Sequence, residues 1–395
     1  MNIVEVKSPK HIQDFLDLPN LIYKDNKAYI RPLNKDIEHV FDQNKNKYFR
    51  HGTCTRWVMY KDNVCIGRVA AFVNDKYTSQ YKDVGGMGFF ECIEDKEAAF
   101  ALFDTAKAWL TEKGMRYMDG PINFQEKDKF WGLTTTNFEQ SPYYGQNYNP
   151  EYYVAFYRDY GFQTFYEQLI YYRLLKTPVQ DKYLARAERL ERDPKFSVQP
   201  IRKSQQKKFS EDFREIYNAA WGKREGDTFK GMSSQQALSI MKSLKPVMDE
   251  RLTYFAYYDG KPIGFYISLP EVNEIFKKFN GKFGLIEKLR FLWHLKIKGV
   301  KTSFGVAFGV SPEFQGKGVE GALFKVCSAN LNRGEKPVYD DVIITWIGDF
   351  NPKMIRIIEF VGGKIHQKME TLRKPFSEGE VIERHSLEKI RDTEA

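Results

Sequence analysis

The apolar and polar positions of the chain follow one order of patterns twice. In each half, two apolar runs rich in aromatic and β-branched residues flank a short polar turn, and a glycine stands early in the second run, at Gly67 and Gly264. Such pairs of runs are typical of β-hairpins. The runs cover residues 55–60 and 64–73 in the first half, and 253–258 and 262–269 in the second. We therefore predict one hairpin in each half.

The elements that follow each hairpin also recur. A glycine-containing apolar strand precedes a helix whose apolar residues recur with a period near 3.6. A further strand comes next, and then a short helix that begins at an Asn-Pro pair and ends at a glycine, which are the usual start and stop signals. The predicted elements are strand 84–93, helix 96–113, strand 117–122 and helix 151–160 in the first half, and strand 301–310, helix 316–332, strand 341–347 and helix 353–361 in the second.

This repetition predicts two copies of one unit. Each copy also begins with a short strand and a helix, so the expected class is α/β with a mixed (α+β) sheet: two tandem domains, each a largely antiparallel sheet flanked by helices. Charged, helix-favouring residues between the copies predict a connecting helix. We place the first domain at residues 1–176, the linker helix at 177–195 and the second domain at 196–395.

The second copy carries a glycine-rich loop between its strand and its helix. Gly316, Gly318 and Gly321 let a ligand approach the backbone without meeting a Cβ atom. The amides of such a loop converge, and the following helix N-terminus adds partial positive charge. Lys317 adds a full charge. The loop is therefore predicted to bind a pyrophosphate group.

The run from Gln315 to Gly321 resembles the acyl-CoA motif of GCN5-related N-acetyltransferases, which reads Q/R-x-x-G-x-G/A. Glu320 stands where glycine or alanine is usual. The helix opened by Asn351 and Pro352 resembles a second motif of this superfamily, and the order of elements resembles it in both halves, as in tandem members such as mycothiol-synthase-like enzymes. The resemblance implies transfer of an acyl group, most simply acetyl, from acetyl-CoA or another acyl-CoA to an amine.

The resemblance also implies which residues bind the cofactor. The strand ending at Val310 would splay from its neighbour, and backbone groups near Phe308 and Val310 would bind the thioester end. The resemblance also implies a cofactor contact for Asn351, which opens the helix of the second motif. The diphosphate would lie on the loop residues Gln315, Gly316, Lys317, Gly318, Val319, Glu320 and Gly321.

Attack of an amine on a thioester needs a base for the amine and an acid for the leaving thiolate. The family often supplies a tyrosine four residues before the glycine that ends the last helix. That position is Ile358 in the second copy and Tyr157 in the first. Glu271, Glu313 and Asp349 stand at predicted strand ends and are candidate bases. The competing interpretations are solvated turn residues for Glu313 and Asp349, and an aromatic core face for Tyr157.

The first copy lacks the glycine-rich loop. Between its strand and its helix, residues 89–98 contain no glycine and four carboxylates. Their charge argues against a bound acyl-CoA there. We expect the first domain to act as a scaffold or to bind the acceptor. The polar and aromatic tract 120–148 is long enough for a functional loop and is a candidate acceptor-binding segment.

Composition narrows the choice of partners and compartment. The net charge of +9 suits nucleic acid, an anionic membrane or an anionic cofactor, but no RNP, zinc-finger or helix-turn-helix pattern supports nucleic acid. The four cysteines and six histidines show neither framework nor ligand spacing, which predicts a reduced, cytoplasmic setting and no metal site. We expect neither a signal peptide nor a transmembrane helix, because no apolar run approaches ~18 residues.

An insert at residues 274–301 interleaves apolar side chains with lysine and arginine. Such an element packs as a lid over the substrate cleft or makes weak contact with an anionic membrane surface. We favour the lid and keep the membrane as the alternative.

These features predict an acyl-CoA-dependent N-acyltransferase that acts on a small-molecule or peptide amine. One alternative is a non-catalytic ligand- or CoA-binding protein on the same fold, suggested by Glu320 and the degenerate first copy. Another is a membrane-associated acyl or aminoacyl transferase, suggested by the insert.

Overall fold

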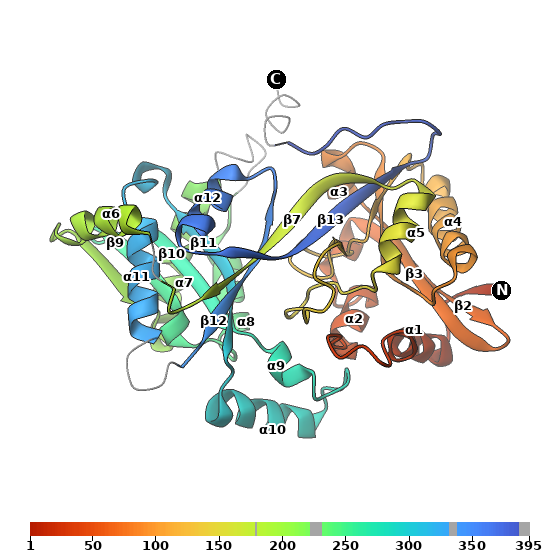
Figure 1. Ribbon diagram of the computed structural model, residues 1–395, viewed down its shortest axis with the longest axis horizontal. Helices are drawn as coiled ribbons and strands as arrows, with labels where there is room; N and C mark the ends of the chain where they lie inside the picture. The colour runs from red at the N-terminus through yellow and green to blue at the C-terminus, as the bar shows by residue number, and fades with distance from the viewer. Residues whose placement is uncertain (178–179, 222–230, 332–337, 387–395) are drawn as a thin grey trace. The chain divides into compact units, whose positions relative to one another are not determined.

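The computed structural model describes residues 1–177, 180–221, 231–331 and 338–386 (Figure 1). Contacts divide the chain into two compact units. Unit 1 consists of Met1–Leu169, Ile275–Leu292 and Gln367–His385, and unit 2 is formed chiefly by Ile170–Glu274 and Trp293–His366. Each helix in the described ranges is too short or too polar to cross a membrane.

The units interleave along the sequence. The boundaries predicted above, 1–176, 177–195 and 196–395, treat each half as continuous, and they remain a prediction. In the contact-based division, a late segment of the chain joins unit 1. Residues 178–179 of the predicted linker lie outside the described ranges, and the remainder contains helix α6 (Asp181–Glu191).

Unit 1 contains a sheet with the strand order β1-β2-β3-β4-β5-β13-β7. β4 and β5 are parallel, whereas β1 to β4 pair antiparallel with one another, as does β5 with β13. The strands are β1 (Asn2–Glu5), β2 (Gly52–Lys61), β3 (Val64–Asn74), β4 (Val84–Cys92), β5 (Tyr117–Gly120), β6 (Leu133–Thr134), the first part of β7 (Gln163–Leu174) and most of β13 (Lys364–Pro375). The helices are α1 (Pro9–Ile22), α2 (Asn34–Phe41), α3 (Asp75–Gln80), α4 (Lys96–Glu112), α5 (Tyr152–Tyr160) and most of α10 (Leu285–Trp293).

Unit 2 repeats this arrangement, with the strand order β7-β12-β11-β10-β9-β8. β11 and β12 are parallel, and β8 to β11 pair antiparallel with one another. The strands are β8 (Phe196–Pro200), β9 (Thr253–Tyr258), β10 (Lys261–Pro270), β11 (Thr302–Val310) and β12 (Asp341–Gly348). The helices are α6, α7 (Gln206–Trp221), α8 (Ser234–Leu244), α9 (Asn273–Phe276), α11 (Val319–Leu331) and α12 (Pro352–Phe360). The predicted class of largely antiparallel sheets flanked by helices is confirmed.

The two predicted hairpins share their turn chemistry. Asp62 and Asn63 join β2 to β3 with φ angles of 50° and 64°, and Asp259 and Gly260 join β9 to β10 with φ angles of 49° and 75°. Two successive positive φ angles are the mark of the type I′ turn, whose twist suits a two-residue hairpin. The hairpins of both units therefore have the same type of turn.

The glycine of each hairpin lets a helix approach the sheet. A Cβ atom at Gly67 would lie 2.7 Å from the Leu102 side chain of α4, and one at Gly264 would lie 2.9 Å from the Val319 side chain of α11. Both distances are below normal van der Waals contact. Each glycine thus marks the place where the main helix of its unit packs on the second hairpin strand.

Both parallel strand pairs separate after a short contact. The β4–β5 register runs from Val84 to Gly86, although β4 continues to Cys92. The β11–β12 register ends at Gly305, although β11 continues to Val310. The splay that the resemblance implied for β11 is present, and unit 1 has the same feature.

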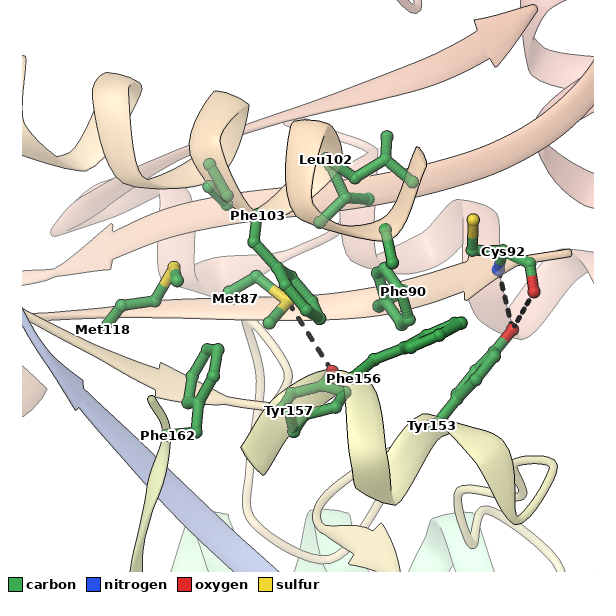
Figure 2. Packing of buried hydrophobic residues seen from close by; sticks show 14 of the residues in the cluster. Met87, Phe90, Cys92, Leu102, Phe103, Met118, Tyr153, Phe156, Tyr157 and Phe162 are labelled. Carbon is green, nitrogen blue, oxygen red and sulfur yellow. Dashed lines mark hydrogen bonds between the residues drawn. The ribbon is translucent and has the colours of Figure 1, made fainter. Parts of the chain in front are cut away.

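An aromatic core fills unit 1 between the sheet and helices α4 and α5 (Figure 2). Phe103 of α4 lies 4.6 Å from Phe90 and 4.9 Å from Tyr157 between ring centroids, and Tyr157 lies 4.9 Å from Phe162. This packing fixes α5 against the C-terminal part of β4.

One predicted helix cap is present and the other is absent. Asn351 caps α12 by accepting a hydrogen bond from the Met354 amide, with Pro352 at the first helical position. Asn149 does not cap α5, which begins at Tyr152. Its side chain instead accepts from the Thr134 amide at 2.8 Å and donates to the Thr134 carbonyl at 3.1 Å. The Asn149 prediction was wrong because a neighbouring strand supplied better partners.

Candidate functional site

The glycine-rich loop of unit 2 holds a carboxylate of its own. Gly316 and Gly318 have φ angles of 74° and 104°, so the loop makes the turn that its glycines were predicted to allow. The Gly316 amide donates a hydrogen bond to Oε1 of Glu320 at 3.1 Å, and Glu320 is only 5% exposed. A diphosphate on this loop would have to displace the carboxylate from that amide.

Neighbouring groups cover other parts of the loop. The Gln315 side chain donates to the Val310 carbonyl at 3.0 Å, so a carbonyl expected near the thioester already has a partner. A Cβ atom at Gly318 would lie 2.6 Å from the Arg186 carbonyl oxygen, which packs α6 against the loop. Lys317 is exposed, whereas Val319 and Gly321 are buried at the start of α11. Among the predicted loop residues, Lys317 is therefore the exposed charge for an incoming anion.

Of the predicted bases of unit 2, Glu313 stands just before this loop in the chain, whereas Glu271 lies far from it. Glu271 is buried and its amide donates to the Thr302 carbonyl at the beginning of β11, whereas the loop follows the end of that strand. Eight residues at about 3.3 Å each separate these ends by roughly 26 Å. Glu313 lies exposed in a 3₁₀ turn, and Asp349 is half-buried directly after β12.

The other predicted cofactor residues have contacts within unit 2. Phe308 stacks on Phe324 with 5.6 Å between ring centroids, and Asn351 caps α12 as described above. These contacts leave their proposed roles toward a cofactor as predictions.

A cavity with an empty volume of about 590 Å³, including space open to solvent, lies in unit 1 where β4 leaves β5. Its walls come from the end of β4, from α5, from the segment between α1 and α2, and from the tract 120–148. Aromatic and aliphatic side chains dominate the lining, and Arg68 and Glu91 are its charged residues. The tract predicted to bind the acceptor contributes Pro121, Phe130, Leu133, Gln146 and Tyr148.

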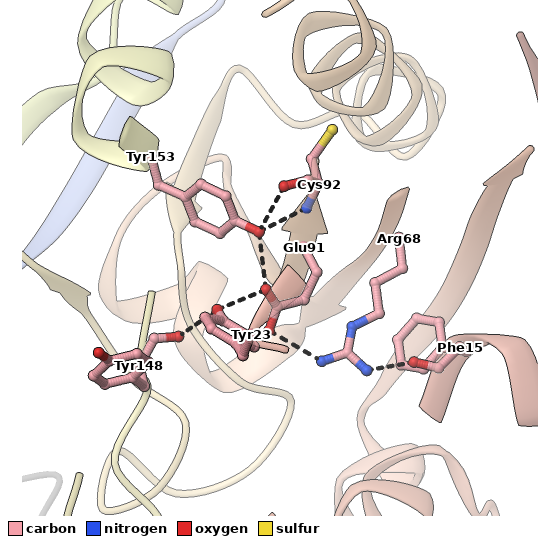
Figure 3. A network of polar contacts seen from close by, with 7 residues as sticks. All are labelled: Phe15, Tyr23, Arg68, Glu91, Cys92, Tyr148 and Tyr153. Carbon is pink, nitrogen blue, oxygen red and sulfur yellow. Dashed lines mark hydrogen bonds and ion pairs between the residues drawn. The ribbon is translucent and has the colours of Figure 1, made fainter. Parts of the chain in front are cut away.

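Glu91 is the centre of a buried polar network on this wall (Figure 3). The hydroxyl groups of Tyr23 and Tyr153 lie 2.8 and 2.9 Å from Oε2 of Glu91, and an Arg68 guanidinium nitrogen lies 3.4 Å from Oε1. Arg68 also donates to the Phe15 carbonyl, and the Cys92 amide donates to the Tyr153 hydroxyl at 2.7 Å. These contacts hold the carboxylate in one position.

Burial dominates the acid–base properties of the network. Removal of Glu91 from water raises its pKa, and this outweighs Arg68 and the two tyrosine hydroxyl groups, which favour the charged form. Burial beside the Glu91 charge also raises the pKa of Tyr23 and Tyr153 well above the usual tyrosine value. Glu91 therefore accepts a proton more readily than an exposed glutamate, while both tyrosines stay protonated as donors.

Tyr157, the predicted acid, lies in the aromatic core next to this network and forms part of the cavity wall. Its hydroxyl lies 3.9 Å from the Met87 sulfur, and burial raises its pKa well above the usual value. Its packing agrees with the core interpretation given above, and a catalytic role stays a prediction.

Sequence reasoning missed Glu91 as a functional candidate and counted it only as a charge that would repel phosphate. A signal was present. Arg68 interrupts the apolar run of β3 and Glu91 that of β4, and the strand register places these two residues directly opposite each other. One acid and one base in neighbouring apolar strands indicate a buried pair, since an unpaired charge there would be strongly destabilising.

Comparison with known proteins places this geometry in context. No protein-family model matches the chain. A bacterial ceramide synthase from Caulobacter vibrioides is 26% identical over 378 residues, which cover 95% of this chain and 97% of that protein. Protein YghO from Escherichia coli is 24% identical over 370 residues, which cover 92% of each chain.

Two solved structures share the architecture of the chain. A tandem GNAT protein from the clavulanic acid biosynthesis pathway has a TM-score of 0.54 and 11% identity, covering 96% of this chain and 99% of that one. A GCN5-related N-acetyltransferase from Sphaerobacter thermophilus has a TM-score of 0.51 and 10% identity, covering 97% and 98%. The chain thus has the tandem GNAT fold.

Proposed function

We propose that the protein transfers an acyl group from an acyl-CoA to the amine of a long-chain amino alcohol, with Glu91 as the base. The tandem GNAT fold supports acyl transfer as the kind of reaction. Similarity to a bacterial ceramide synthase over nearly the whole chain supports an acceptor of this class, because a ceramide is the amide of a fatty acid and a long-chain amino alcohol.

One observation carries the proposal: a buried glutamate with a raised pKa stands in the wall of a cavity that combines aromatic and aliphatic side chains with polar ones, where two parallel strands separate. An aliphatic acceptor suits walls of phenylalanine, leucine and tyrosine. A carboxylate in such a wall provides a polar point that would orient the amino group of the acceptor.

Between heavy atoms, the reaction forms one bond and breaks one. The amine nitrogen bonds to the thioester carbon, the carbon–sulfur bond breaks, and CoA leaves as a thiolate that takes up one proton. Glu91 accepts the proton that the nitrogen loses, and return of that proton to the CoA thiolate restores the carboxylate. Burial favours this step because it makes the protonated carboxyl group more stable than it would be in water.

The loop of residues 315–321 in unit 2 stays the predicted site for an acyl-CoA diphosphate, whereas transfer at Glu91 requires an acyl-CoA thioester in the cavity of unit 1. The contact between Gly316 and Glu320 makes this assignment conditional on movement of the Glu320 side chain. Acetyl-CoA and longer acyl-CoAs are equally compatible with that contact, which concerns the diphosphate alone.

The test uses the full chain with acetyl- through palmitoyl-CoA and either sphinganine or a small soluble amine. Thiol release and mass spectrometry of the amide measure the reaction. We expect the long-chain amide and CoA in equal amounts. Glu91→Gln should lower kcat by about 100-fold or more, the size typical of a lost general base, whereas Glu94→Gln, an exposed carboxylate three residues further on, should leave kcat unchanged. Absence of product with every acyl-CoA, or a wild-type rate for Glu91→Gln, would refute the proposal.

A second candidate is a non-catalytic binding protein, and Glu320 is the observation that favours it. A carboxylate seated on the loop amide competes with an anionic ligand. The same assay separates the candidates, since a binding protein would take up acyl-CoA in calorimetry without releasing CoA in the presence of any amine.

A further inference from the structure

The insert at residues 274–301 presents an apolar face to solvent. Its helix α10 is continued by a π-helical turn at His294–Lys298. Leu285, Ile286, Leu289 and Trp293 are 75, 68, 62 and 54% exposed. Their spacing of one, four and eight residues places them on one side of the helix. We call these four residues, with the exposed Leu292, the apolar face.

The opposite side of α10 is fixed to unit 1. Phe291 is buried and stacks on Phe276 with 5.2 Å between ring centroids. The Lys35 ammonium lies 3.9 Å from the ring centroid of Phe283, and the Asn34 amide donates to the Gly281 carbonyl at 2.8 Å. Because these contacts hold the helix by one side, the apolar face points away from the unit that carries it. A lid would have to turn this face toward a cleft.

Positive charge surrounds the apolar face. The insert at residues 274–301 contains eight lysine and arginine side chains and two acids, Glu274 and Glu287. Five of the cations precede or lie within α10, and all five are exposed: Lys277, Lys278, Lys282, Lys288 and Arg290. Glu287 accepts from the Gly284 amide at the helix start and offsets little of this charge.

We propose that the apolar face docks on an anionic phospholipid bilayer, with its side chains at the level of the acyl-chain boundary and the cations among the headgroups. An amphipathic helix with cations beside its apolar stripe binds such surfaces through buried area and charge together. A second copy of the chain would bring two cationic rings together, and their repulsion disfavours self-association through this face. The biological role of this docking rests on the proposed function, because a long-chain acceptor resides in a bilayer.

Sedimentation with vesicles tests the docking directly. Wild-type protein is mixed with phosphatidylcholine vesicles, with or without 30% phosphatidylglycerol, at low and at high salt. We expect binding to the anionic vesicles at least tenfold tighter than to neutral ones, and weaker binding at high salt. The double variant Leu285→Glu/Leu289→Glu should bind at least tenfold more weakly. The control Val64→Glu/Val381→Glu replaces two apolar residues elsewhere that are 54 and 84% exposed and should bind like wild type.

The results that would contradict the docking differ from those that would contradict the proposed function. Equal binding to neutral and anionic vesicles, or wild-type binding by the Leu285→Glu/Leu289→Glu variant, overturns the docking. The docking is also overturned if light scattering shows a wild-type dimer that dissociates in this variant. CoA release with a soluble amine, measured without vesicles, reports on the transfer reaction alone. Thermal unfolding confirms that each variant is folded.

Discussion

The Tyr153 hydroxyl lies 2.9 Å from Oε2 of Glu91, and the Tyr23 hydroxyl lies 2.8 Å from the same oxygen. Two donors on one oxygen stabilise the ionised carboxylate, whereas burial stabilises the neutral form. Burial is the larger effect, so the Glu91 pKa lies above its ordinary value of 4.5. The tyrosines therefore moderate a base that burial has already strengthened.

Removal of the Tyr153 hydroxyl should move the pH dependence of the reaction. In Tyr153→Phe the carboxylate loses one donor, its pKa rises further, and the acid limb of kcat/KM should shift upward by about one pH unit, as expected for a hydrogen bond to a charged group. Measurement of kcat/KM against pH checks this. Tyr160 is on the same helix, α5, but its hydroxyl donates to Asp104 of α4, so Tyr160→Phe should leave the limb in place. An unmoved limb in Tyr153→Phe would show that another group titrates.

Loss of Arg68 should destabilise unit 1 strongly. Arg68→Met leaves Glu91 buried without its cation, a change that typically costs about 3–5 kcal/mol. The free energy of unfolding in urea measures the loss, and the double variant Arg68→Met/Glu91→Gln should recover part of it. If the double variant is as unstable as the sum of the single ones, the pair is not coupled.

The Arg68–Glu91 pair also predicts how the stability of the protein changes with pH. A carboxyl group whose folded pKa is raised contributes stability that is fully present below the unfolded value near 4.5 and is lost as the pH rises through the folded pKa. The deficit of Arg68→Met should therefore be smallest in acid and grow as the pH rises through the folded pKa of Glu91 in the wild type, which lies above 4.5. Unfolding curves at several pH values check this, and an equally large deficit at every pH would contradict it.

The affinity of the unit 2 loop for acyl-CoA should depend on the Glu320 carboxylate. Glu320→Gln removes a negative charge from the Gly316 amide and should raise acyl-CoA affinity about tenfold, or ~1.4 kcal/mol, whereas Lys317→Glu should lower it. Calorimetry measures both. Gly318→Glu is a poorer test because any side chain there meets the Arg186 carbonyl. Equal affinities for all three proteins would move the diphosphate away from this loop.

A second buried ion pair should anchor β13 in unit 1. Arg373 donates to both oxygens of the fully buried Asp119, at 2.6 and 2.8 Å. Arg373→Met leaves that charge unpaired and should cost about 3–5 kcal/mol. Arg384→Met breaks the exposed pair with Glu167 and should cost less than about 1 kcal/mol. Urea unfolding measures both, and similar costs would mean that the buried pair is not decisive.

The duplicated fold was predictable because its signals are local. The Asp-Asn and Asp-Gly turns and the Asn-Pro start of α12 act within a few residues of themselves. The position of Glu91 was not predictable in the same way. Its meaning depends on the register that brings Arg68 opposite to it and on Tyr23 and Tyr153, which lie 68 and 62 positions away in sequence.

The glycine-rich loop of unit 2 has one feature that the sequence predicts and one that it does not. Its glycines predict a turn, and the positive φ angles of Gly316 and Gly318 agree. Whether Glu320 turns toward the Gly316 amide or away from it depends on one side-chain rotamer, which composition and spacing do not determine. The exposure of Leu285 likewise depends on which side of α10 the core phenylalanines take.

The assignment of residues 367–385 to unit 1 has a consequence for biosynthesis. The ribosome translates these residues after nearly all of the rest of the described chain, so the N-terminal sheet waits with the edge of β5 unpaired until β13 emerges. Unpaired strand edges are sites of aggregation in nascent chains. Slow translation or early termination near the end of the message would thus damage the part of the protein that was made first.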